Sequence, residues 1–179
     1  MANKQILHSL HGRQFGLGPD NEVIVNDSAR SGLADAQCLV WSIARKEITT
    51  AQVLALRATP IEIVAAPGAL KAIIVDHVEA FIDYNSTAYV DDAGDDLSFR
   101  YTDNSGIEVC APIDGADFLD NAADIFAYSP GVITDAALGF VPTVNAAVVV
   151  TVNNSEVITG NSPIFIHLYY RIVDTVLTA

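Results

Sequence analysis

From residue 38 onward, hydrophobic and polar positions alternate with a period of two, which is the pattern of β-strands that bury one face. The longest alternating segment covers residues 71–84. Its expected buried face consists of Ala72, Ile74, Val78, Ala80, Ile82 and Tyr84, interrupted only by Asp76. A straight strand of this length would extend roughly 46 Å at about 3.3 Å per residue, so we expect a bend or bulge near residues 76–77.

The same alternation predicts further strands, and two other segments suit short helices. The strands are expected at residues 38–45, 61–65, 97–102, 107–112, 124–128, 131–134, 146–152 and 164–172. Helical turns are expected at residues 50–56 and 114–123, the second with Asp114 as its N-cap. Many strands, irregular loops and little helix predict an all-β fold, namely a β-sandwich or jelly-roll-like domain with one or two short helices.

Residues 1–37 differ from the rest, because glycines separate short apolar segments that cannot form a core. Residues 22–25 are the one strand candidate here, and an isolated pair of strands is marginal in water. We therefore expect an extended N-terminal arm over residues 1–37 that becomes ordered on a partner, followed by a β-sandwich domain over residues 38–179. The alternative is an ordinary strand and loops packed on that domain.

The charge is distributed unevenly along the 179 residues, whose formal net charge is −13. Residues 1–71 carry about +1 and residues 72–179 carry −14. An acidic body repels phosphate, which argues against nucleic-acid partners. Only 17% of the residues are charged and 51% are hydrophobic. Either other subunits cover part of the surface, or strands rich in Ala and Val account for the composition.

Neither a membrane span nor a secretory leader is expected. Apolar runs fall short of the roughly 18 residues that a transmembrane helix needs. The first residues lack the continuous apolar region of a signal peptide. Cys38 is followed by two apolar residues and Cys110 lies between Val109 and Ala111, so both are expected to be buried thiols rather than a disulfide. The expected site of synthesis is a cytoplasm.

Candidate metal ligands do not form a convincing site. The histidines are His8, His11, His77 and His167, and no two of them share a strand with a carboxylate in the spacing of a facial metal triad. Residues 91–96 are rich in Asp but depart from the calcium-loop pattern, so a solvated acidic tip is favoured over a Ca²⁺ site. Nucleophile and phosphate-loop motifs are also missing. We expect no catalytic, cofactor-binding or metal-binding residues and no enzymatic activity.

Three segments resemble a known class of protein. Residues 10–25 (LHGRQFGLGPDNEVIV) are similar to leaders of structural proteins of tailed bacteriophages. Residues 48–75 and 100–106 (RYTDNSG) are similar to small β-rich proteins encoded beside phage capsid genes. The resemblance covers about residues 10–130. It lies in the general pattern of residue types and includes no catalytic or ligand-binding motif. It implies a head decoration (cement) protein, a class that typically forms trimers over capsomer junctions.

The resulting hypothesis is a structural virion protein that is assembled in a bacterial host cytoplasm and stabilises the outer surface of a phage capsid. Its implied partners are the major capsid protein and two further copies of itself. The expected capsid-contact residues in the arm are Arg13, Phe15, Leu17, Val23 and Val25. The alternative is a carbohydrate- or receptor-binding module of a phage tail or fibre. That module would use exposed aromatic residues, for which the candidates are Tyr84, Tyr89, Tyr169 and Tyr170. A small hydrolase or isomerase is a third, less favoured, hypothesis.

Overall fold

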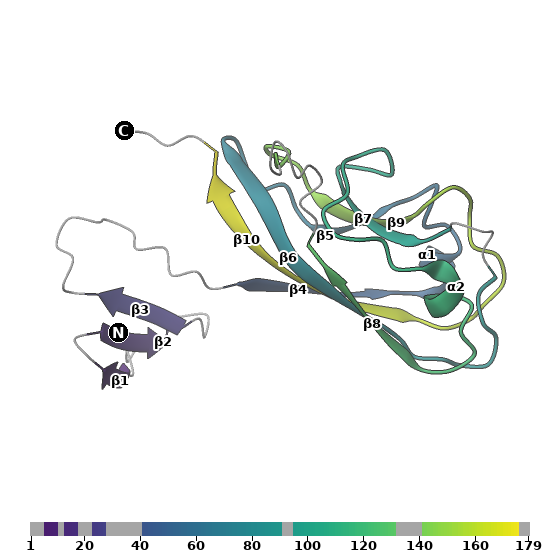
Figure 1. The fold of residues 1–179 in the computed structure, drawn as a ribbon, viewed down its shortest axis with the longest axis horizontal. Coiled ribbons are helices and arrows are strands. Elements are labelled where there is room, and N and C mark those ends of the chain that lie inside the picture. Colours follow the sequence, from purple (N-terminus) through teal and green to yellow (C-terminus); the bar gives the residue numbers. More distant parts are fainter. Residues whose placement is uncertain are drawn as a thin grey trace. The chain divides into compact units, whose positions relative to one another are not determined.

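The fold was analysed in a computed structural model of the chain (Figure 1). The structure describes residues 41–90, 95–131 and 141–175, together with the backbone of three strands nearer the N-terminus. The chain divides into two compact units, Met1–Val40 and Trp41–Ala179. The sequence predicted a boundary after residue 37.

The first unit contains three short strands that form an antiparallel sheet in the order β1-β2-β3. The strands are β1 (Ile6–Leu10), β2 (Arg13–Leu17) and β3 (Val23–Asp27). The strand expected at residues 22–25 lies within β3. The sequence did not predict β1 and β2, because each offers only a few apolar positions next to glycine-rich turns.

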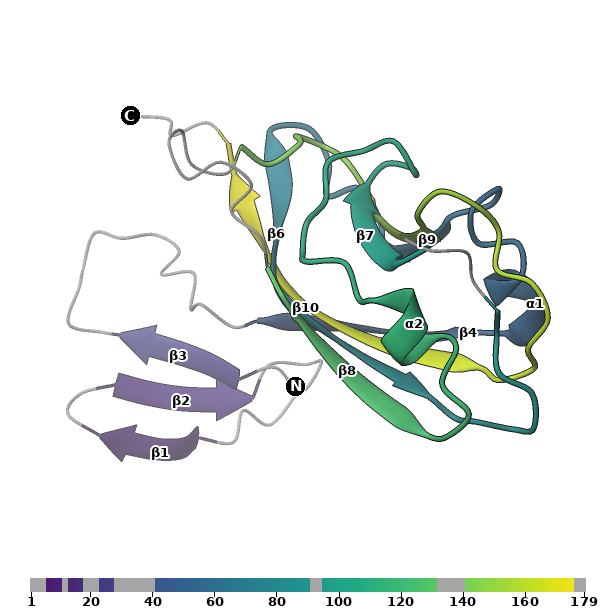
Figure 2. The same ribbon diagram turned by 45° about the vertical axis from the view of Figure 1, so that its right-hand side comes forward.

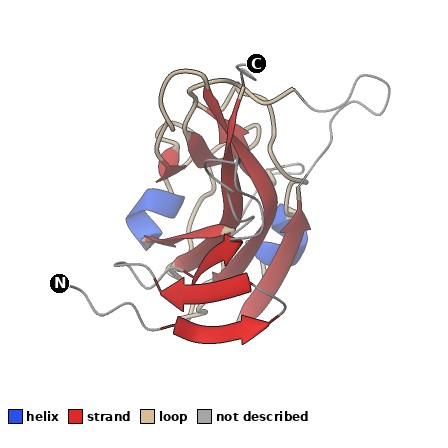
Figure 3. Ribbon diagram, turned by 90° about the vertical axis from the view of Figure 1, so that its left-hand side faces the viewer, coloured by secondary structure: helices blue, strands red, loops and turns tan. Residues whose placement is uncertain are grey.

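The second unit contains two antiparallel sheets and two short helices (Figures 1 and 3). A four-stranded sheet has the order β4-β10-β6-β8 and a three-stranded sheet has the order β5-β9-β7. The strands are β4 (Ser42–Ile48), β5 (Ile61–Val64), β6 (Lys71–Ile82), β7 (Leu97–Tyr101), β8 (Ile125–Pro130), β9 (Val148–Val152) and β10 (Ile164–Asp174). The helices are α1 (Thr50–Val53) and α2 (Gly115–Phe118). This arrangement confirms the predicted all-β, sandwich-like fold.

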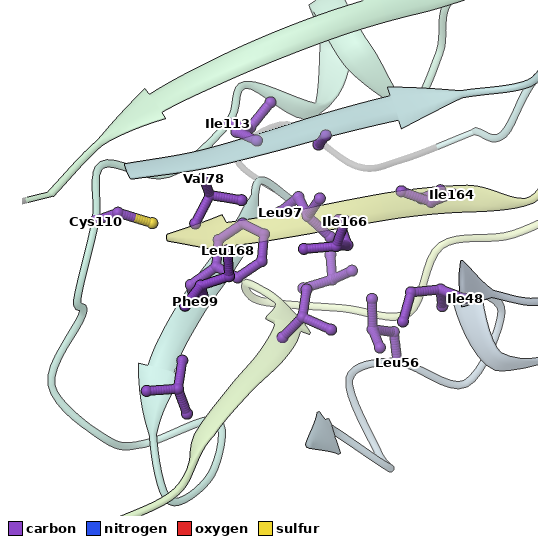
Figure 4. Close-up of a cluster of buried hydrophobic side chains, with 14 of the residues drawn as sticks. Ile48, Leu56, Val78, Leu97, Phe99, Cys110, Ile113, Ile164, Ile166 and Leu168 are labelled. Carbon is purple, nitrogen blue, oxygen red and sulfur yellow. The ribbon is translucent and has the colours of Figure 1, made fainter. Parts of the chain in front are cut away.

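A single hydrophobic core lies between the two sheets (Figure 4). Phe99 of β7 and Leu168 of β10 point into it from opposite sheets, and both are fully buried. Every residue of β9 is buried, because its second face is covered by the turn after α1, where the Thr151 hydroxyl donates to the Leu56 carbonyl at 3.3 Å. The core residues that the structure describes all belong to the second unit.

The expected irregularity in the long strand β6 is confirmed as a bulge at Asp76. Tyr169 of β10 pairs with His77, whereas the next residue, Tyr170, pairs with Val75. Asp76 consequently has no residue opposite it on β10, which is the arrangement of a β-bulge.

This bulge corrects the predicted buried face of β6. The sequence placed Ala72 and Ile74 on that face. Ala72 is buried, but the other buried residues before the bulge are Ile73 and Val75, and Ile74 is only half-buried. One extra residue shifts the alternation of side chains by one position, so the pattern read from residues 78–82 does not continue through residue 76.

Several local expectations also have clear outcomes. Asp114 caps α2 as predicted, accepting a hydrogen bond from the Ala116 N–H at 3.0 Å. Residues 107–112 form isolated bridges rather than the expected strand. Ile172, expected on the buried face of β10, is 44% exposed, because β10 extends past the core at its C-terminal end. Among the described residues, no helix is long and apolar enough to cross a membrane.

Candidate contact surface

The side of the four-stranded sheet that faces away from the core is the most distinctive surface of the described chain. Ile164, Ile166 and Leu168 of β10 point into the core, so the alternate residues of β10 form the opposite side. We call this side the outer face and define it by the cross-strand rows that the register creates. Each row contains one residue from β4, β10, β6 and β8, in that order. The first row is Glu47, Phe165, Phe81 and Phe126. The second row is Arg45, His167, Glu79 and Tyr128, and the third is Ile43, Tyr169, His77 and Pro130.

Aromatic stacking organises the centre of the outer face. The His77 ring lies 4.1 Å from the Tyr169 ring and 5.1 Å from the Tyr128 ring, measured between centroids, and both pairs are stacked. The bulge places Asp76 beside His77, and Asp76 Oδ2 lies 2.7 Å from His77 Nδ1. The Asp76 carboxylate and two aromatic rings therefore hold the imidazole of His77 in place.

Glu79 links the polar groups of the outer face. The Tyr169 hydroxyl donates to Glu79 Oε2 at 3.2 Å, and His167 Nδ1 lies 3.7 Å from the same oxygen. Desolvation of the phenol, together with the bond to the Glu79 carboxylate, raises the pKa of Tyr169 above its ordinary value. Three carboxylates, those of Asp76, Glu47 and Glu79, stand against the guanidinium groups of Arg45 and Arg171, so the outer face carries only a small part of the net charge of −13.

Trp41 and Arg171 extend the outer face beyond the start of β4. The Arg171 guanidinium lies 5.3 Å from the centre of the Trp41 ring, within the range of a cation–π contact. The Arg171 Nε atom is buried and has no hydrogen-bond partner among the described residues. Stacking on the indole therefore contributes to the position of this guanidinium.

The outer face exposes more apolar surface than a solvated sheet requires. Phe126 is 60% exposed, Tyr128 59%, Ile43 40% and Trp41 37%. Solvated faces of antiparallel sheets are ordinarily polar, whereas exposed aromatic and apolar residues beside a polar rim are typical of protein-contact surfaces. The outer face thus has the chemistry of a binding surface.

The residues expected to contact a capsid lie on β2 and β3. In the ladder between these strands, Phe15 pairs with Val25 and Leu17 with Val23, while Arg13 pairs with Asp27. The structure therefore brings the expected contact positions together on two adjacent strands. Their side chains lie outside the described part of the chain.

The candidate metal ligands are dispersed. His77 and His167 lie on the outer face, His8 is on β1 and His11 lies outside the described residues. Among the described residues, no group of three or more His, Cys, Asp or Glu side chains could hold a metal ion.

The acidic segment 91–96 is described only from residue 95. Asp95 is fully buried and accepts hydrogen bonds from the Ser155 N–H and hydroxyl, at 2.8 and 2.5 Å. The prediction of a solvated tip is therefore wrong for Asp95, because the turn after β9 covers it. Asp96 accepts from the Gly115 N–H at 3.2 Å and so supports the start of α2.

The two cysteines have different outcomes. Cys110 is free and buried, as expected, and desolvation raises the pKa of its thiol to about 12. Cys38 lies outside the described residues.

The expected set of exposed aromatic residues needs correction. Tyr89 is buried, because its hydroxyl reaches the Ser162 carbonyl on another segment of the chain. Among the described residues, the most exposed aromatic side chains are those of Phe126 and Tyr128, which were not among the expected candidates. The sequence feature that indicates these two residues is the alternation of aromatic with smaller residues along residues 125–130, which leaves both faces of β8 apolar.

No protein-family model, no curated protein and no solved structure matches the chain.

Proposed function

We propose that this chain is a structural protein of a tailed-phage virion that binds the outside of the capsid and stabilises it. The observation that carries the proposal is the outer face, an exposed aromatic and apolar surface on a sandwich whose other side packs on a buried hydrophobic core. Such a surface suits contact with protein. The resemblance of residues 10–25, 48–75 and 100–106 to phage structural proteins supports a capsid as the partner.

The first unit is the proposed capsid anchor. Its expected contact residues, Arg13 with Phe15, Leu17, Val23 and Val25, share one pair of strands. An antiparallel sheet of three short strands has two edges, and an exposed edge can accept a strand from a partner. The excess of acidic over basic residues lies after residue 71, and residues 1–71, which include this anchor, carry a net charge of about +1.

A specific observation also favours the alternative, a saccharide- or receptor-binding module of a tail or fibre. Phe126, Tyr128 and Trp41 are exposed aromatic residues on a sheet face, and rings of this kind can stack on sugar rings. Glu79 and His167 would supply hydrogen-bonding groups beside them.

One experiment separates the two functions. The gene for this chain is deleted in the phage that encodes it, and the particles are compared with wild-type particles in head stability and host adsorption. Capsid decoration predicts heads that lose DNA at a lower temperature, adsorption that is unchanged, and recovery of stability when the purified protein is added back. Stable heads with impaired adsorption would assign the chain to the tail and contradict the proposal.

A further inference from the structure

Edge strand β8 differs from the other edges of the described sandwich. The edge strands of its two sheets are β4, β8, β5 and β7. Natural edges are commonly protected from pairing by charged residues. β4 contains Arg45, Lys46 and Glu47, β5 contains Glu62 and β7 contains Arg100, whereas β8 contains no charged residue. β8 also carries Phe126 and Tyr128, the two most exposed aromatic residues of the outer face.

β8 is an edge strand of the four-stranded sheet (Figure 2), and no hydrogen bond from another described segment reaches the backbone of Phe126 or Tyr128 along this edge. At the end of the strand, the Pro130 carbonyl accepts a hydrogen bond from the Ala111 N–H at 3.1 Å, on the side away from β6. Because backbone groups alternate direction along an antiparallel strand, the N–H and C=O groups of Phe126 and Tyr128 point to that same side.

We propose that β8 pairs in an antiparallel ladder with β8 of a second copy of this chain, centred on Ala127. This register places Phe126 opposite the second copy's Tyr128. In an antiparallel ladder this pair exchanges two backbone hydrogen bonds. The two-fold axis creates a second, identical pair between Tyr128 and the second copy's Phe126. Pro130 ends the ladder, because it has no N–H and its carbonyl is already occupied.

Charge and side-chain matching favour a second copy as the occupant. Two chains of net charge −13 repel each other, so a self-contact must use a segment that brings no like charges together. In the proposed register, Ile125 lies opposite Ser129, and this is the last pair, because Ala111 already lies on the open side of Pro130. Aromatic cross-strand pairs, here Phe126 with Tyr128, are among the stabilising pairs of antiparallel sheets.

The contact joins the two four-stranded sheets into one continuous sheet and closes after two copies. It therefore predicts a dimer of twice 19.0 kDa rather than the trimer that the resemblance implies. This inference does not depend on the capsid role, since it rests on the β8 edge alone.

The test compares Tyr128→Lys with the matched variant Ile43→Lys by light scattering at micromolar concentration. Both positions are exposed on edge strands of the same sheet, so each variant retains its core. We expect the wild type and Ile43→Lys to be dimers and Tyr128→Lys, which brings a new charge to the contact on each chain, to be a 19.0 kDa monomer. A wild-type monomer or trimer would overturn the proposal, as would a Tyr128→Lys dimer. Unchanged far-ultraviolet circular dichroism serves as the folding check.

Hydrogen exchange distinguishes strand pairing from packing of the outer faces. The amides of residues 126 and 128 should be protected in the wild-type dimer and exchange at least tenfold faster in Tyr128→Lys. Equal exchange in the two proteins contradicts edge pairing. If the amides of residues 126 and 128 are protected only when the protein is bound to capsids, the β8 edge pairs with another protein. That result would also overturn the proposed contact between two copies of β8. Attachment to heads is scored separately, so failure of this inference leaves the proposed function open to its own test.

Discussion

Replacing Ile166 by Ala tests whether the core between the two sheets holds the sandwich together. Ile166 lies on β10, in the interior of the four-stranded sheet, and its side chain is fully buried. The substitution removes three carbons, which corresponds to about 2.4 kcal/mol of transfer free energy at about 0.8 kcal/mol per methylene. Incomplete collapse of the cavity raises the expected loss to roughly 3–4 kcal/mol.

Ile158→Ala is the matched control, because it removes the same atoms from a side chain that is 60% exposed. Its expected cost is about 1 kcal/mol or less, since most of that surface is already in water. A difference of roughly 2–3 kcal/mol is a large share of the roughly 5–15 kcal/mol by which a domain is stable.

Urea unfolding of both variants, followed by circular dichroism at equal protein concentration, measures the two losses. An unchanged slope of free energy against urea shows that the variants unfold from comparably compact states. If the two substitutions destabilise the protein equally, Ile166 does not occupy a packed core and the sheet arrangement is wrong.

Three further outcomes follow from individual contacts. Desolvation raises the pKa of the Cys110 thiol to about 12, so Cys110 should be alkylated at pH 8 roughly a thousandfold more slowly in the folded than in the urea-unfolded protein. Peptide mass spectrometry measures the two rates, and comparable rates would contradict its burial. Arg100→Met should lower the free energy of unfolding in urea by roughly 2–4 kcal/mol, because it leaves Glu108 without the guanidinium that lies 2.6 Å away. A decrease below about 0.5 kcal/mol would show that the pair is not stabilising. Gly106→Ala should lower the melting temperature by several degrees, because the new Cβ would lie 1.7 Å from the Tyr101 carbonyl oxygen; an unchanged melting temperature would show that this turn is placed wrongly.

The sequence predicted the elements well wherever a local pattern determines them. Alternation located β6, β7, β9 and β10, and the length of the alternating segment predicted the bulge, since a long strand on a compact core must bend. The consequence of the bulge for Ile73 and Ile74 could not be predicted, because one inserted residue reverses the alternation without changing the composition.

The outer face could not be predicted, because it depends on pairing between distant strands. His77 meets Tyr128 and Tyr169 only through the register of β6 with β8 and β10. Similarly, Tyr89 and Asp95 look like exposed loop residues, but segments more than 50 residues away cover them. Local sequence does not contain that information.

The most direct test of the proposed function is cosedimentation of the purified protein with undecorated phage heads, comparing the full chain with a variant that lacks residues 1–40. The buried core described here runs from Ile48 to Leu168, so the shortened protein should remain folded, with an unchanged circular dichroism spectrum. The account predicts saturable binding of the full chain to heads and much weaker binding by the shortened protein, which keeps the outer face but lacks the anchor. Full binding by the shortened protein would move the anchor to the sandwich, and a full chain that stays in the supernatant at every concentration would contradict capsid decoration itself.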